Sequence, residues 1–306
     1  MRKEWVRYLC DPIDKTNLKI DKIFKINGSN ILFGTLRSES GNIYSIKEGV
    51  PILLNRHTQP VRTVDSFAYE WEQFDFDYGK KGWQEDVVRP SVGGLKYFKN
   101  KVIVDCGAGS GQQSLWMAQA GAKFVFSLEL SNAAQTIIKK VTERYQDKIF
   151  VIQGDLAHLP INKKFVGVDL IYCVNVIQHT ENPQKTLSEL SLLLRPESEF
   201  LFNIYLKRKN LCLINLVQLL KKIMKEFPNS LIKLISLMIA ITTYPLKLTK
   251  HSFRESWLDV YDLLGSHSYQ EFYSEKDVAK MLTKSRLKIV KRSHYAMILK
   301  KINFSV

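Results

Sequence analysis

From residue 101 onward, apolar runs alternate with segments of helical periodicity. Val102–Asp105 is a continuous apolar run that ends in an acid, as expected of a strand buried on both faces of a parallel sheet. The same alternation continues to about residue 205. It predicts strands at 124–129, 149–153, 169–174 and 200–205, and helices at 112–119, 132–145 and 183–194. This order predicts an α/β fold with a doubly wound, mostly parallel sheet.

Three further regions surround this alternation. Residues 1–55 contain short strand-like runs, at 30–36 and 42–46, separated by glycine turns, and predict a small β-rich domain. Residues 56–100 form an aromatic connector, and the main α/β domain is expected over 101–306. Within it, residues 207–253 form an insertion with two or three helices, and Ser274 is expected to cap a helix before two terminal strands at 287–292 and 295–300.

Composition narrows the class of protein. The chain has 306 residues, 45% hydrophobic, which fits a globular protein rather than a disordered one. Its N-terminus lacks the apolar stretch of a secretory signal, and its four scattered cysteines show no disulfide framework, so a cytoplasmic location is expected. The net charge of +15 is explained either by lysines that solvate helix faces or by an anionic partner.

Several candidate ligand-binding residues follow the predicted strands. Gly107 and Gly109 allow close approach of a ligand to the backbone, and Asp105 lies at the end of the first strand. Glu129 ends the second strand, where an acid can accept hydrogen bonds from both hydroxyls of a ribose. A glycine turn and an acid at this spacing suit either a dinucleotide or S-adenosylmethionine, and Asp155, with Leu156, favours the second.

Taken together, four segments resemble the successive motifs of class I S-adenosylmethionine-dependent methyltransferases. They are VIVDCGAGSG, SLELS, GDLAHLP and DLIYCVNVIQHTENP. The resemblance implies a Rossmann-like, seven-stranded sheet with S-adenosyl-L-methionine as cofactor. It also implies roles for individual residues: Asp105, Gly107, Ala108 and Gly109 contact the methionine part, Glu129 the ribose, Asp155 and Leu156 the adenine, and Asn175 faces the sulfonium.

The N-terminal region resembles the small zinc-ribbon-like activator domain of some methyltransferases. The resemblance rests on the closing segment, Tyr44–Leu54, and on Cys10 in LCDPID. That domain carries two pairs of cysteines, whereas here only Cys10 remains. Because a structural zinc site needs about four ligands, no metal is expected.

Methyl transfer to a hydroxyl requires a base, and His179 is the candidate because it follows the fourth strand. A capping or packing role for this histidine is the competing interpretation. Tyr69 and Trp71 in the connector are candidate lid residues, with an interdomain seam as the alternative. Asp259 and Tyr261 are candidate contacts to a polar substrate, or surface turn residues.

The insertion has two interpretations. Residues 207–250 contain nine Lys or Arg residues and one acid, Glu226, so they carry +8 of the chain's net charge. They form either a helical cap over the substrate pocket or a basic surface that lies peripherally on an anionic membrane. The apolar run 231–246 contains Lys233 and is too short to span a bilayer.

The sequence therefore predicts a methyltransferase (EC 2.1.1.-) that acts on a small molecule or on a glycan or lipid-linked precursor, with O-methylation favoured. One alternative is an RNA methyltransferase, but the fourth motif offers no aromatic platform for a flipped base, so nucleic acid is not the expected partner. Another is a catalytically inactive module that retains the cofactor.

Overall fold

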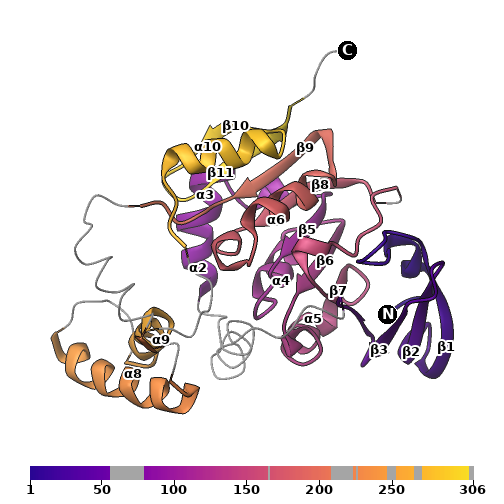
Figure 1. Ribbon diagram of the computed structural model, residues 1–306, viewed down its shortest axis with the longest axis horizontal. Helices are drawn as coiled ribbons and strands as arrows, with labels where there is room; N and C mark the ends of the chain where they lie inside the picture. Colours follow the sequence, from indigo (N-terminus) through magenta and orange to yellow (C-terminus); the bar gives the residue numbers. More distant parts are fainter. Residues whose placement is uncertain are drawn as a thin grey trace.

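The computed structural model describes residues 1–55, 79–164, 166–207, 223–224, 227–246, 253–264 and 271–302 (Figure 1). In these residues, eleven strands form one sheet in the order β1-β2-β3-β4-β7-β6-β5-β8-β9-β11-β10. The strands are β1 (Leu18–Asn27), β2 (Asn30–Ser38), β3 (Ile43–Lys47), β4 (Val50–Leu53), β5 (Val102–Cys106), β6 (Phe124–Glu129), β7 (Ile149–Gly154), β8 (Val168–Cys173), β9 (Leu194–Phe202), β10 (Leu287–Arg292) and β11 (Met297–Lys301).

The centre of the sheet is parallel and buried. β5 pairs with β6 on one side and with β8 on the other, and β7 and β9 extend the parallel part outward. The apolar runs of these strands fit this position because helices cover both faces of a parallel sheet. All the parallel strands β5–β9 end at the same edge, where ligands bind in folds of this Rossmann-like type.

The sheet has eleven strands among the described residues, whereas seven were expected. The difference arises because the four N-terminal strands β1–β4 belong to the same sheet. β4 pairs in parallel with β7, with Ile52 opposite Gln153 and Leu53 opposite Gly154. Without β4, the outer edge of β7 would present unpaired N–H and C=O groups. The apolar segment Val50–Leu53 satisfies that edge, and β1–β3 continue from it as an antiparallel meander.

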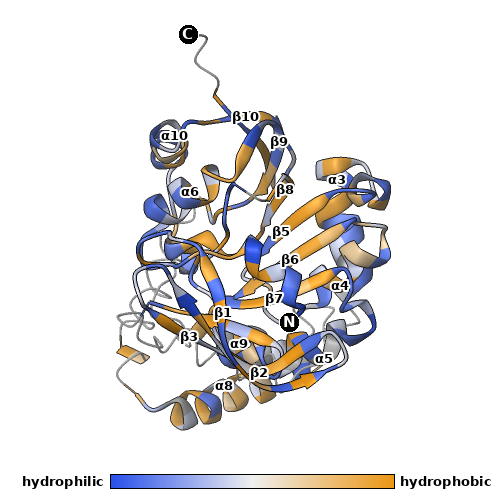
Figure 2. Ribbon diagram, turned by 90° about the vertical axis from the view of Figure 1, so that its right-hand side faces the viewer, coloured by the Kyte–Doolittle hydropathy of each residue, from blue (hydrophilic) through white to orange (hydrophobic). Residues whose placement is uncertain are grey.

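Helices cover the two faces of the sheet (Figure 2). Trp116 of α4 and Val88 of η3 pack on one face, and Leu187 of α6 and Leu282 of α10 on the other. The described helices and helical turns are η1 (Lys3–Tyr8), α2 (Lys80–Gly82), η3 (Trp83–Val88), α3 (Arg89–Val92), η4 (Leu95–Phe98), α4 (Gln112–Gln119), η5 (Asn132–Ala134), α5 (Ile137–Thr142), η6 (Glu143–Tyr145), η7 (Leu156–His158), η8 (Ile177–His179), α6 (Pro183–Ser191), α8 (Asn229–Thr243), η9 (Tyr244–Leu246), α9 (Phe253–Leu264) and α10 (Glu275–Lys284).

Three predicted elements differ from the structure in extent or continuity. The helix expected over 183–194 is α6, which ends at Ser191, and Leu194 belongs to β9 instead. The single helix expected over 132–145 is divided into η5, α5 and η6, and Ser131, rather than a helical residue, begins the first turn by accepting a hydrogen bond from Ala133 N–H. The strand expected at 200–205 is β9, which begins earlier, at Leu194, and ends at Phe202. The prediction for Ser274 is confirmed, since it forms a capping box with Asp277 at the start of α10.

The main described part of the insertion is the helix α8. It packs against α9, which begins at the last residue of the expected insertion, and the two helices lie at one end of the molecule (Figure 1). Ile232 on α8 and Tyr261 and Leu264 on α9 form a small apolar cluster of their own, together with Met224. Most of the helix expected before residue 224 lies outside the described residues. Among the described helices, none is long and apolar enough to cross a membrane.

Candidate active site

The turn after β5 is the centre of the candidate site. Gly107 and Gly109 have φ angles of +64° and +56°, in the left-handed region that favours glycine. A Cβ at Gly107 would lie 2.8 Å from the side chain of Val176, which follows β8. The N–H of Ala108 donates to the carbonyl of Leu128 in β6 at 2.8 Å. The turn is therefore held tightly between the ends of β6 and β8.

Asp105 lies beneath this turn and is almost completely buried. Its Oδ2 accepts a hydrogen bond from Ser114 Oγ on α4 at 2.5 Å, and Ser114 Oγ is 2.9 Å from Ser127 Oγ. Its Oδ1 has no partner in the described structure. Burial raises the pKa of Asp105 to about 7, the hydrogen bond from Ser114 opposes this shift, and the charge of Glu129 adds to it.

Glu129 ends β6 with both carboxylate oxygens directed to backbone donors. Its Oε2 accepts from the N–H of Gly109 at 3.0 Å, and its Oε1 accepts from the N–H of Ser131 at 2.8 Å. Each carboxylate oxygen has two lone pairs, so each keeps the capacity to accept one further hydrogen bond. This is the arrangement that a vicinal diol, such as that of a ribose, requires.

Asp155 and Leu156 follow β7. Asp155 caps η7 by accepting from Ala157 N–H at 2.8 Å, and its other oxygen lies 2.7 Å from His158 Nδ1. Lys185 Nζ is 2.5 Å from His158 Nε2, and because an ammonium only donates, Nε2 is the acceptor and Nδ1 carries the proton given to Asp155. Leu156 is buried in the core. These contacts fix the turn, and the adenine role of both residues stays a prediction.

The residues present fit an adenosine-containing cofactor. The turn runs beside Glu129, whose carboxylate oxygens retain the acceptor capacity that a diol needs. Two buried oxygens near the turn, Asp105 Oδ1 and Gln112 Oε1, have no protein partner in the described structure. Gln112 begins α4 directly after Gly111 and was not singled out from the sequence, where a glutamine at that position carries no signal.

Asn175, the residue expected at the sulfonium, lies in a hydrogen-bonded network at the end of β8. Its φ is +61°, a strained value for a residue other than glycine. Its backbone N–H donates to Asn203 Oδ1 at 2.6 Å, and Asn203 Nδ2 donates to its Oδ1 at 2.8 Å. Its own Nδ2 donates to the hydroxyl of Tyr295 at 2.9 Å, which leaves the Tyr295 proton available to another acceptor.

Beyond this network lies a cleft of about 730 Å³, within the size range of small-molecule sites. One wall carries the rings of Tyr205 and Phe272, whose centroids are 5.7 Å apart. Arg292 lies on the rim in an ion pair with Glu275. The cleft is lined by Asn175, Asn203, Ile204, Tyr205, Leu206, Lys207, Phe272, Glu275, Arg292, Ser293, His294, Tyr295, Ala296 and Met297.

The other predicted residues differ in their relation to this cleft. His179 ends η8 and its ring is perpendicular to that of Tyr205, with the centroids 5.7 Å apart, so it lies beside a cleft-lining residue. Asp259 and Tyr261 belong to α9 rather than to a surface turn, and Tyr261 is buried in the apolar cluster of the helix pair. Tyr69 and Trp71 lie outside the described residues.

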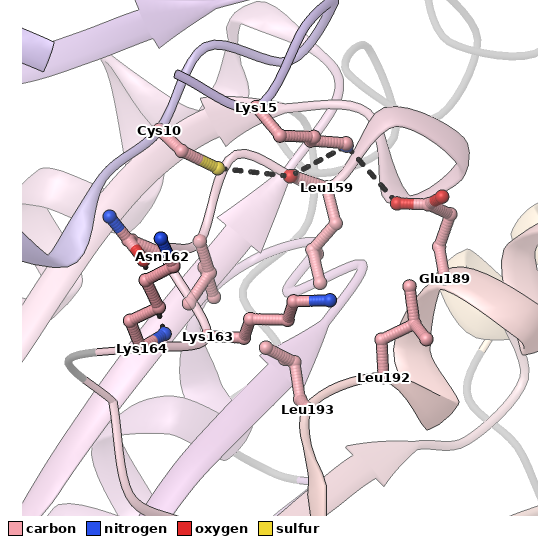
Figure 3. Close-up of a pocket in the computed structure, with 10 residues that line it drawn as sticks. Cys10, Lys15, Leu159, Asn162, Lys163, Lys164, Glu189, Leu192 and Leu193 are labelled. Carbon is pink, nitrogen blue, oxygen red and sulfur yellow. Dashed lines mark hydrogen bonds and ion pairs between the residues drawn. The ribbon is translucent and has the colours of Figure 1, made fainter. Parts of the chain in front are cut away.

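Cys10, the remnant of the expected zinc-ribbon pattern, lies in a small pocket where the N-terminal segment meets the sheet (Figure 3). Its Sγ donates to the carbonyl of Leu159 at 3.7 Å, and burial raises the pKa of its thiol to about 11. Lys15 donates to the same carbonyl and pairs with Glu189. Among the described residues, no group of three or more His, Cys, Asp or Glu could hold a metal ion.

Comparison with known proteins supports the assignment of the central strands to a methyltransferase domain. Residues 104–202, about a third of the chain, match the family described as "Methyltransferase domain". This segment begins at β5 and ends with β9, so it contains the glycine turn, Glu129 and Asn175. The match supports an S-adenosylmethionine-dependent methyltransferase and indicates S-adenosylmethionine as the cofactor.

Curated relatives share only part of their length with this chain. The histone-arginine methyltransferase CARMER of Drosophila erecta is 30% identical over 165 residues, which cover 50% of this chain and 30% of that protein. The corresponding protein of Anopheles gambiae is 34% identical over 122 residues, 36% of this chain and 19% of its own. The chain thus spans less than a third of the length of these relatives.

Among solved structures, the 1,6-didemethyltoxoflavin-N1-methyltransferase of Burkholderia thailandensis is 12% identical, with a TM-score of 0.46 over 85% of this chain and 96% of that one. The magnesium protoporphyrin IX methyltransferase of Synechocystis is 18% identical, with a TM-score of 0.44 over 77% and 91%. At these values the likenesses say nothing about the substrate.

Proposed function

We propose that this chain transfers the methyl group of S-adenosylmethionine to an oxygen of a small molecule, or of a glycan or lipid-linked precursor, held in the cleft beyond Asn175. The observation that carries the proposal is the position of the segment after β8. Val176 packs against Gly107 of the cofactor turn, and the neighbouring Asn175 lines the cleft. One short segment thus separates the proposed cofactor site from the proposed acceptor site.

On the cofactor side, Glu129 would hold the ribose hydroxyls through the free acceptor capacity of its two oxygens. Gly107, Ala108 and Gly109 would accommodate the methionine part, with Asp105 Oδ1 and Gln112 Oε1 as the available buried acceptors. Asp155 and Leu156 would border the adenine. The bound cofactor supplies an electrophilic methyl group on a sulfonium.

On the acceptor side, the residues of this chain orient the nucleophile and receive its proton. The hydroxyl of Tyr295 accepts a hydrogen bond from Asn175, so its own proton can be donated to the substrate. That hydrogen bond would hold the substrate at the end of the cleft next to Asn175. Alignment of two reacting groups by such contacts supplies much of the rate of a displacement reaction. His179, beside Tyr205, is the proposed base for a hydroxyl acceptor.

The first test is calorimetric titration of the purified chain with S-adenosylmethionine and its demethylated product. We expect saturable binding that Glu129→Ala weakens, because the ribose loses its acceptor. Glu48→Ala is the matched control, since Glu48 is an exposed acid in the turn between β3 and β4, and its side-chain partner is Lys139. Absence of binding by well-folded protein would refute the cofactor site, and equal loss in both variants would refute the role of Glu129.

The second test is a methyl-transfer screen with labelled cofactor. Phenols, sugars and lipid-linked glycans are compared with RNA and an arginine-rich peptide, and the bond formed is identified in the product. We expect a small hydroxyl-bearing acceptor whose turnover is lowered by His179→Gln, because its hydroxyl loses the group that takes its proton. The loss should shrink at high pH, where the hydroxyl ionises without a base. Labelling of RNA or peptide alone would overturn the proposed acceptor class but not the cofactor site.

A further inference from the structure

The outward face of α8 is unusually apolar. Leu234, Met238 and Ile241 are 54%, 61% and 54% exposed, and their spacing of four and three residues places them on one stripe of the helix. The opposite stripe, with Ile232 and Ala240, is buried. α8 is therefore held by one face, while the other presents large apolar side chains to the surroundings.

Further large apolar residues near the ends of the helix in the sequence are also exposed. Ile223 and Phe227, before α8, and Tyr244, directly after it, are also exposed apolar residues. An exposed stripe of large apolar side chains on a folded protein commonly marks an interaction site. The position of α8 is fixed by its contacts with α9: the two helices share an apolar cluster, and Trp257 Nε1 donates to Ser236 Oγ at 3.0 Å.

The positive charge of the sequence around α8 indicates a negatively charged partner. Residues 207–250 carry nine Lys or Arg residues and one Glu, and these residues include the whole of α8. An apolar helix face with basic residues before and after it along the chain is the combination that binds the interface of an anionic bilayer: the apolar side chains enter the acyl boundary and the cations meet the headgroups. A neutral or cationic protein partner would gain nothing from the excess of positive charge.

The chain also connects this surface to the cleft. Tyr205, Leu206 and Lys207 line the cleft, and the basic segment begins at Lys207. We propose that the exposed face of α8, defined by Leu234, Met238 and Ile241, seats this chain on the surface of an anionic lipid bilayer. This inference does not depend on the proposed acceptor, and it holds for any substrate of the cleft.

Vesicle flotation tests the proposal with the full chain. Vesicles of phosphatidylcholine alone are compared with vesicles that also contain phosphatidylglycerol, at low and high salt. We expect binding only to the anionic vesicles, weakened by salt as exposed charges are screened. Leu234→Glu with Met238→Glu should lower the partition coefficient about a hundredfold, since each apolar side chain withdrawn from the interface contributes about tenfold.

The matched control is Ile23→Glu with Phe24→Glu, which makes the same change of charge at two exposed apolar residues of β1. This control should float like the unaltered chain. Circular dichroism and titration with S-adenosylmethionine show that both variants are folded and separate a lost membrane contact from a failed cofactor site. The proposal is overturned if the unaltered chain does not float or if the control loses binding equally. It is also overturned if the α8 variant still floats and differs from the unaltered chain only in its oligomeric state in solution.

Discussion

Replacing Gly107 by alanine tests how the glycine turn is built. The substitution introduces two separate costs. The φ of +64° costs an alanine about 1–2 kcal/mol, because the left-handed conformation brings Cβ close to the carbonyl oxygen. The new Cβ would also lie 2.8 Å and 2.9 Å from the two methyl groups of Val176, an overpacking that costs about 1–3 kcal/mol. We expect a total loss of about 2–5 kcal/mol in the free energy of unfolding.

Two further variants separate these costs. Gly28→Ala is the matched control, because Gly28 has a φ of +56° and no atom within 4 Å of its Cβ, so it measures the conformational cost alone. Val176→Ala in the Gly107→Ala background removes the clash. It should restore the part of the free energy of unfolding that the clash costs, but not the part due to the left-handed conformation. The coupling free energy from this double-mutant cycle should be about 1–3 kcal/mol.

Urea denaturation measures the free energies, and titration with S-adenosylmethionine measures the function of the turn. Gly107→Ala should weaken cofactor binding, whereas Gly28→Ala should not. If Gly107→Ala is no more destabilising than Gly28→Ala, or if Val176→Ala gives no coupling, then the turn is not packed against Val176 as described. Unchanged cofactor affinity would show that the turn does not contact the cofactor.

Three other predictions follow from single contacts. The pKa of Asp105 in the folded state, about 7, lies above its ordinary value of 3.8. The folded state therefore holds this proton more tightly, and the free energy of unfolding should fall as pH rises from 3.8 to 7. Asp105→Asn should flatten that part of a profile of urea midpoint against pH, and an unchanged profile would contradict the assignment. Ser274→Ala should cost about 1 kcal/mol in urea denaturation by removing the cap of α10, with cofactor binding unchanged; a neutral effect would mean that the capping box with Asp277 contributes nothing. Tyr295→Phe should leave the Kd for S-adenosylmethionine unchanged and lower kcat for the acceptor found in the screen; unchanged kcat would exclude Tyr295 from orienting it.

The sequence determined the local parts of the site. The apolar run of β5, the glycines after it and the acid that ends β6 are short-range signals, because burial on both faces and a left-handed turn each impose a residue type at a fixed place. For the same reason the cap of α10 was predictable from Ser274. The helix over 132–145 was not, because a continuous helical pattern does not show where Ser131 and its neighbours form a separate turn.

Tertiary structure alone decided the contacts between distant segments. Asn203 and Tyr295 contact Asn175 from 28 and 120 residues away in the sequence, and no local pattern relates the three. The one available signal was the polar residue directly after β9, which could have indicated Asn203. The length of the sheet was decided in the same way. Any apolar strand can satisfy the open edge of β7, and only the folded chain shows that β4 does so and adds the N-terminal strands to the sheet. Propensity and periodicity act within one element, whereas the pairing of edges and the closure of a cleft depend on which elements fold side by side.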